Sequence, residues 1–85
     1  MNNANLLKTV NENLKNSKLI DSRKENFDGY QYTPAFLEYE TNGIVTTLVY
    51  ASGQNVEVWQ RTPMNPADKV IGLWNKKLLN IKDKF

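Results

Sequence analysis

Residues 35–61 read AFLEYETNGIVTTLVYASGQNVEVWQR, three apolar runs separated by two short turns. The first turn holds Asn42-Gly43, the pair that a type I′ hairpin favours because both central residues need a positive φ. The second turn, residues 52–55, reads SGQN and again contains glycine. The alternation around these turns predicts three antiparallel strands, at residues 35–41, 44–51 and 56–61.

The two turns also predict which residues lie opposite each other in the sheet. The first places Leu37 opposite Leu48, and the second, with Ala51 paired to Val56, places Leu48 opposite Trp59. Since successive side chains point to opposite faces, the sheet has an aliphatic face and an aromatic face. The aliphatic face is expected to hold Phe36, Val45, Val49, Ala51, Val56 and Val58, with Glu38 and Glu40 toward one edge. The aromatic face is expected to hold Leu37, Tyr39, Ile44, Leu48, Tyr50 and Trp59, with Glu57 and Arg61 among them.

The residues before the hairpins predict a helix and then a further strand. Four apolar side chains of residues 3–16 lie within about 100° of one another on a helical wheel, which predicts an amphipathic helix. They are Leu6, Leu7, Val10 and Leu14. Residues 18–32 predict one more strand, and the alternatives are two strands with a turn at Asp28-Gly29 or a loop anchored by Phe27.

The C-terminal segment carries the signals of a second helix. Asn65 suits the N-cap position, and Pro66 suits the first helical position, where its missing N–H is not needed. Apolar residues then recur within one arc of about 100°. They are Ala67, Val70, Ile71, Trp74, Leu78, Ile81 and Phe85. These signals predict a helix over residues 66–83 that packs across the sheet.

Together these elements predict a single α+β domain that spans residues 1–85. The expected order is α-β(β)-β-β-α, a three- to four-stranded antiparallel meander packed against the C-terminal helix. Three arrangements of the helices are open. Helices on opposite sides would cover both faces of the sheet. Helices that share the aliphatic face would leave the aromatic face exposed, and the reverse arrangement would expose the aliphatic face.

Composition narrows the chemistry of the chain. Its 85 residues contain no cysteine and no histidine, which removes disulfides, Cys/His zinc sites and histidine acid–base catalysis. The net charge is only +2, so no strongly basic surface is implied. There is no apolar run of the roughly 20 residues that span a membrane, and the first residues lack the features of a signal peptide. We therefore expect a cytoplasmic protein that is not an enzyme and holds no cofactor or metal.

Without a catalytic motif, the aromatic face is the strongest candidate for function, because aromatic side chains beside a guanidinium are typical of recognition surfaces. The residues predicted to bind a partner are Leu37, Tyr39, Leu48, Tyr50, Trp59 and Arg61. We expect a module that binds a protein stoichiometrically, as a phage or mobile-element inhibitor of a host or defence protein or as an immunity-type partner. One alternative is a small nucleic-acid-binding domain that stacks bases on the aromatic face, and another is a structural homodimer.

Overall fold

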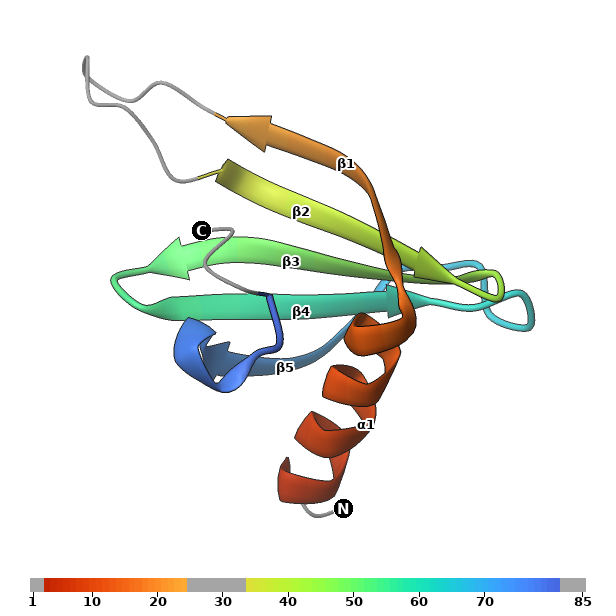
Figure 1. The fold of residues 1–85 in the computed structure, drawn as a ribbon, viewed down its shortest axis with the longest axis horizontal. Coiled ribbons are helices and arrows are strands. Elements are labelled where there is room, and N and C mark those ends of the chain that lie inside the picture. Colours follow the sequence, from red (N-terminus) through yellow and green to blue (C-terminus); the bar gives the residue numbers. More distant parts are fainter. Residues whose placement is uncertain (1–2, 25–33, 82–85) are drawn as a thin grey trace.

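Strands that follow each other in the chain lie side by side in the structure (Figure 1). The computed structural model describes residues 3–24 and 34–81. In order, it contains α1 (Asn3–Asn16), β1 (Lys18–Lys24), β2 (Pro34–Thr41), β3 (Ile44–Ser52), β4 (Asn55–Arg61), β5 (Lys69–Asn75) and the short 3₁₀ helix η1 (Lys76–Leu78). The strands form one antiparallel sheet in the order β1-β2-β3-β4-β5. The small single domain is α+β as predicted, but the predicted three or four strands are too few.

The N-terminal helix lies where the spacing of its apolar residues predicts it. Val10 and Leu14 of α1 are buried, and the next residues, Lys18–Lys24, form β1. The predicted alternative of a second strand beyond a turn at Asp28-Gly29 lies outside the described residues. No helix in the described part of the chain has the length and apolar character needed to cross a membrane.

The first hairpin has the register that its turn sequence predicts. Asn42 and Gly43 both have positive φ, 51° and 82°, as a type I′ turn requires. The Gly43 amide donates a hydrogen bond of 3.1 Å to Glu40 Oε1. A Cβ at Gly43 would lie 2.8 Å from Pro63 Cγ, so the β2–β3 turn packs against the β4–β5 loop at this end of the sheet (Figure 1).

The second hairpin differs from its prediction by one residue. Ala51 bulges out of β3, so that Tyr50 lies opposite Val56. A slip of one residue moves every side chain of a strand to the other face. The predicted pairing of Leu48 with Trp59 is therefore wrong, and Val58 takes the place of Trp59. The β4 residues that change faces relative to the prediction are Val56, Glu57, Val58, Trp59 and Arg61.

The predicted C-terminal helix is also wrong, because its described residues form β5 and η1. Asn65 does not cap a helix but closes a tight loop, in which it exchanges backbone hydrogen bonds of 3.0 and 3.1 Å with Thr62. Residues 70–74 read VIGLW, a run that favours a strand, and Gly72 would cost a helix about 1 kcal/mol. Since β4 offers a free edge of backbone donors and acceptors, pairing in the sheet outweighs the local helix signals.

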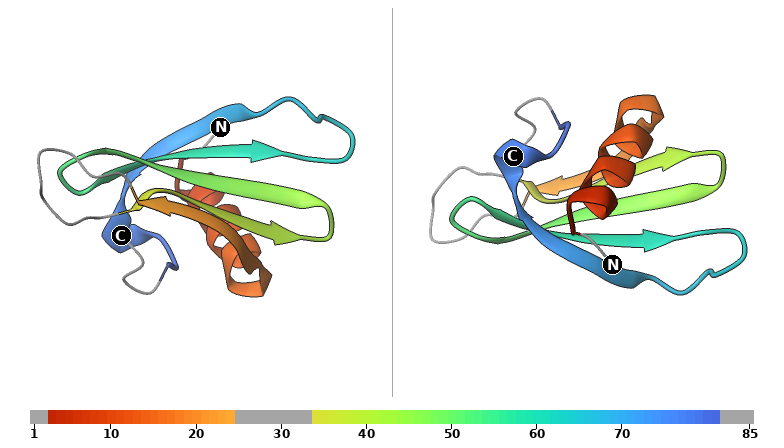
Figure 2. Two further views of the ribbon diagram at one scale, coloured as in Figure 1. Left: turned by 90° about the horizontal axis from the view of Figure 1, so that it is seen from above. Right: turned by 90° about the horizontal axis from the view of Figure 1, so that it is seen from below.

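One face of the sheet is covered by α1 and the C-terminal residues 79–81 (Figure 2). Their side chains form the core with those of β2, β3 and β4 that point to the same side. The core residues are Val10, Leu14, Leu37, Tyr39, Leu48, Val56, Val58, Leu79 and Ile81. Of the three arrangements that the sequence leaves open, this one resembles the arrangement with the aliphatic face outward. It differs in β4, where the slip places Val56 and Val58 on the covered face and Trp59 on the open face.

Candidate partner-binding surface

We call the face of the sheet opposite α1 the open face. By the register of the strands, its central residues are Phe36, Glu38, Glu40, Val45, Thr47, Val49, Glu57, Trp59, Arg61, Val70 and Leu73. Both views of Figure 2 place α1 on the other side of the sheet. No helix in the described part of the chain packs on the open face.

Apolar side chains cross the open face from β2 to β5. Phe36 lies opposite Val49 on the next strand, and Trp59 lies opposite Val70. At the free edge of β5, Val70 and Leu73 are 52% and 56% exposed. An uncovered stripe of apolar side chains of this kind is typical of a protein interaction site.

The Trp59 indole is held in a defined orientation within this stripe. Its Nε1–H donates a hydrogen bond of 2.9 Å to Glu57 Oε1, and the side chain is only partly buried. Ordering a side chain on binding costs free energy, and a ring that is already oriented avoids part of that cost. Tryptophan is also among the residues that most often dominate the energy of an interface. Trp59 therefore has both the chemistry and the geometry of an anchor.

Arg61 stands between two carboxylates on the open face. Its Nη1 lies 3.8 Å from Glu38 Oε2 and 3.6 Å from Asp68 Oδ1. The Arg61 side chain is 37% exposed, and ion pairs this accessible to water stabilise a fold by about 1 kcal/mol at most. Their main effect is geometric, because they hold the guanidinium along the surface.

Thr47 lies in the middle of the open face with an unsatisfied hydroxyl. It lies opposite Glu38 and Trp59, and its Oγ1 is buried without a hydrogen-bond partner among the described residues. An unpaired buried polar group costs about 1–3 kcal/mol. Its neighbour Thr46, on the covered face, accepts a hydrogen bond of 3.3 Å from Gln60 Nε2. The Thr46 hydroxyl therefore has a hydrogen-bond partner, whereas the Thr47 hydroxyl has none among the described residues.

The six residues predicted to bind a partner do not share one face. Leu37, Tyr39 and Leu48 lie in the core beneath α1. Tyr50 points to the same side of the sheet and is 38% exposed, whereas Trp59 and Arg61 lie on the open face. Their grouping as one surface is therefore wrong, and its cause is the bulge at Ala51. Burial also raises the pKa of the Tyr39 phenol, as expected for a core residue.

Three open-face residues escaped the sequence analysis because they fall in the predicted helix. They are Asp68, Val70 and Leu73. The signal that could have found them is the strand-like run VIGLW at residues 70–74. Phe36, Val45 and Val49 are placed by the sequence on the aliphatic face, which is the face that the structure leaves open.

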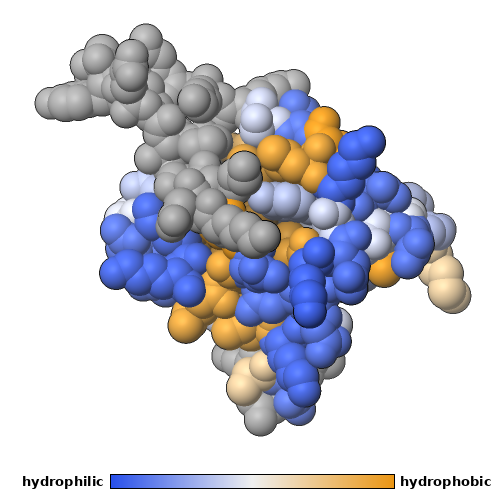
Figure 3. Space-filling model, viewed as in Figure 1, coloured by the Kyte–Doolittle hydropathy of each residue, from blue (hydrophilic) through white to orange (hydrophobic). Residues whose placement is uncertain are grey.

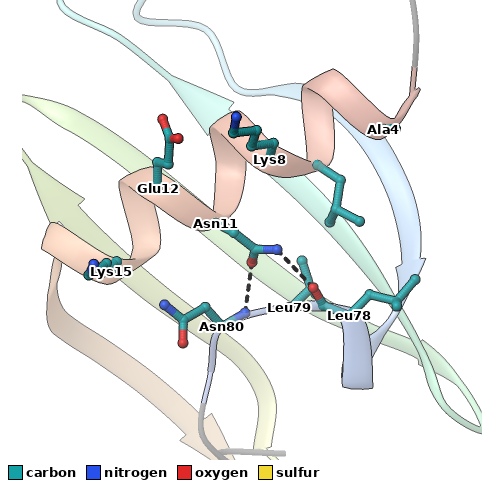
Figure 4. A pocket seen from close by; sticks show the side chains of 9 residues that line it. Ala4, Lys8, Asn11, Glu12, Lys15, Leu78, Leu79 and Asn80 are labelled. Atoms are coloured by element: carbon teal, nitrogen blue, oxygen red, sulfur yellow. Dashed lines mark hydrogen bonds between the residues drawn. The ribbon is translucent and has the colours of Figure 1, made fainter.

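A second concave surface lies between α1 and the C-terminal segment (Figure 4). It measures about 560 Å³ and is lined by Ala4, Leu7, Lys8, Asn11, Glu12, Lys15, Leu78, Leu79 and Asn80. Asn11 Nδ2 donates to the Leu78 carbonyl over 2.8 Å, and Asn11 Oδ1 accepts from the Asn80 amide over 2.7 Å. Because both ends of the Asn11 amide serve the fold, we interpret this groove as a packing seam between the two segments.

Comparisons with protein-family models, with curated proteins and with solved structures found no match. Within residues 3–24 and 34–81, no three Asp, Glu, His or Cys residues are grouped so that they could hold a metal ion. The open face and its residues are therefore the features of this chain that bear on its function.

Proposed function

We propose that this chain is a protein-binding module that acts stoichiometrically, without catalysis, and that it binds its partner through the open face. The observation that carries the proposal is the oriented, partly buried Trp59 in an apolar stripe that no described helix covers. Aromatic residues and arginine are enriched in interfaces, and a few of them supply most of the binding energy. Trp59 is the proposed anchor, and Arg61 is the proposed oriented polar contact.

A module of this kind works by occupying a surface of its partner. In this proposal the chain is an inhibitor of a host or defence protein, of the sort that phages and mobile elements encode, or an immunity-type partner. Both roles need a small rigid domain with one specialised face, and neither needs a catalytic group. The core beneath α1 and the uncovered opposite face support such a division of the molecule.

A structural homodimer is the second candidate, and β5 favours it. This edge strand exposes Val70 and Leu73 and carries a single charged residue, Lys69. Apolar edge strands without inward charges or prolines can pair with another strand. A nucleic-acid-binding role has less support, because Glu57 accepts a hydrogen bond from the Trp59 indole and Glu38 lies on the same face two strands away, and both carboxylates would repel phosphates.

The test is affinity capture on the immobilised chain from lysate of the cells that produce it, with and without nuclease. We expect a protein recovered in stoichiometric amount that survives nuclease. Trp59→Ala should then weaken its binding by about 30-fold or more, which corresponds to about 2 kcal/mol. Circular dichroism establishes whether the variant is folded. Recovery of nucleic acid alone would favour the nucleic-acid alternative.

Two leucines provide a matched pair of variants that should both fold. Leu73, on the open face, is 56% exposed, and Leu78, on the α1 side, is 54% exposed. Leu73→Ala should weaken the complex, and Leu78→Ala should leave it unchanged. Equal effects of the two substitutions, or unchanged binding by a folded Trp59→Ala variant, would contradict binding through the open face.

A further inference from the structure

The two sides of the sheet carry opposite charge, although the net charge of the chain is only +2. On the open side, the described residues provide five carboxylates, those of Asp21, Glu38, Glu40, Glu57 and Asp68. Among the side chains that the structure describes, the cations on that side are Lys18 and Arg61, and Arg23 of β1 lies opposite Phe36 in the register. Among the described side chains, carboxylates therefore outnumber cations on the open side.

The α1 side has the reverse balance. Its lysines are Lys8 and Lys15 of α1, Lys69 of β5, and Lys76 and Lys77 of η1. Lys69 belongs to this side because its strand partner Gln60 points to the covered face. Among the described residues of that side, Glu12 provides the opposing carboxylate. Figure 3 looks onto this side and shows hydrophilic residues along one flank of α1, next to an apolar area. An acidic or polyanionic partner would therefore be attracted to the α1 side and repelled by the open face.

The carboxylates of the open face are only partly neutralised within the fold. Arg61 lies near Glu38 and Asp68, and Lys18 lies opposite Glu40 on the neighbouring strand. The Glu57 carboxylate, in contrast, accepts from an uncharged indole. Asp21 lies directly opposite Glu38 on the neighbouring strand, and like charges in this position oppose strand pairing. Cations from outside would relieve that repulsion and pair with the remaining carboxylates.

We propose that the partner's contact surface is apolar at its centre and rich in lysine and arginine around it. This inference rests on the proposed function, because it specifies the chemistry of the protein that the open face binds. The apolar stripe with Trp59 meets the centre of that surface, and Glu40, Glu57 and Asp21 meet its cations. Complementary charge speeds the encounter and rejects partners of the wrong sign.

The first test uses a short amphipathic helical peptide with leucine on one face and lysine on the other, and its counterpart with glutamate for lysine. Two side chains report on the two sides of the sheet in NMR spectra, the Trp59 indole N–H and the Asn11 amide. The lysine peptide should shift the Trp59 signal and leave the Asn11 signal in place. The glutamate peptide should leave the Trp59 signal unchanged. Failure of the lysine peptide to shift Trp59, or a Trp59 shift with the glutamate peptide, would overturn the inference.

The second test removes one negative charge from either side of the sheet. Glu57→Gln should weaken the lysine peptide by about two- to fivefold, the range expected for an exposed ion pair. Glu12→Gln, which changes the net charge equally, should have no effect. Glu40→Gln, away from the indole, should repeat the result of Glu57→Gln. Added salt should weaken the complex, because it screens exposed charges.

The outcomes separate this inference from the proposed function. Equal losses for Glu57→Gln and Glu12→Gln would show attraction to net charge alone and would overturn the inference. So would a captured partner whose binding depends on Trp59 but resists salt and both glutamine substitutions on the open face. That last result would still support binding through the open face, but it would show that the partner's contact surface carries no important positive charge.

Discussion

The covered and open faces are built from alternate residues of the same strands, yet they differ in how completely they are packed. In β4, Val56 and Val58 are both 0% exposed, whereas Glu57 and Trp59 beside them are partly accessible. The covered face joins apolar side chains from the sheet, α1 and the C-terminal segment. The open face mixes apolar side chains with carboxylates and an unpaired hydroxyl. Among the described residues, the main core cluster therefore lies on one side of the sheet, and the mixed apolar and charged side chains lie on the other.

The largest expected effect separates two valines that receive the same substitution. Val58→Ala should lower the free energy of unfolding by about 2–3 kcal/mol, because the lost methyl groups leave a cavity in the core. Val49→Ala, on the open face, should cost about 1 kcal/mol or less, because solvent can fill the space. Urea denaturation followed by circular dichroism measures both. Equal losses would mean that the two faces are equally packed.

Two neighbouring threonines should respond to the same substitution with opposite sign. Thr47→Val should raise the free energy of unfolding by about 1 kcal/mol, because it removes a buried hydroxyl that has no partner. Thr46→Val should lower it by about 1 kcal/mol, because it breaks the hydrogen bond from Gln60. Thermal unfolding of both variants provides the comparison. A destabilised Thr47→Val variant would show that its hydroxyl is satisfied in solution.

The smallest expected effect is a difference in alkaline stability. Burial raises the pKa of the Tyr39 phenol above its ordinary value of 10.0. The folded state therefore gains stability from the neutral phenol below about pH 10, and loses it as the pH rises through the higher pKa of the folded state. Tyr39→Phe should make stability fall less steeply above about pH 10. Tyr50→Phe removes the same hydroxyl from an exposed side chain and is the control. Identical alkaline profiles for Tyr39→Phe and the wild type would contradict the assignment.

Elements that depend on local interactions can be predicted from the sequence, whereas elements that depend on distant residues cannot. The register of the first hairpin follows from Asn42-Gly43, whose required backbone angles are a local property. No local feature marks Ala51 as a bulge, so the second register could not be read from its turn. The bulge becomes understandable only from burial, because it places Val56 and Val58 beside the other core residues.

The same reasoning explains the error at the C-terminus and its effect on the site. The local signals at Asn65 and Pro66 favour a helix, whereas the free edge of β4 is formed by residues earlier in the chain. Trp59 and Arg61 could be selected from the sequence by residue type. Their neighbours Val70 and Leu73 could not, because the positions of these two residues depend on the pairing of β5 with β4 across a bulge.

The bridge from Asn11 to Leu78 spans 67 residues, and it has a consequence for how the chain folds during synthesis. The hairpins of β2, β3 and β4 involve nearby residues and can form early, since closing short loops is fast. The core cannot close until Leu79 and Ile81 have left the ribosome and met Val10 and Leu14. We therefore expect the hairpins to form while the chain is still being synthesised and the core to pack in one step after residues 79–81 have emerged.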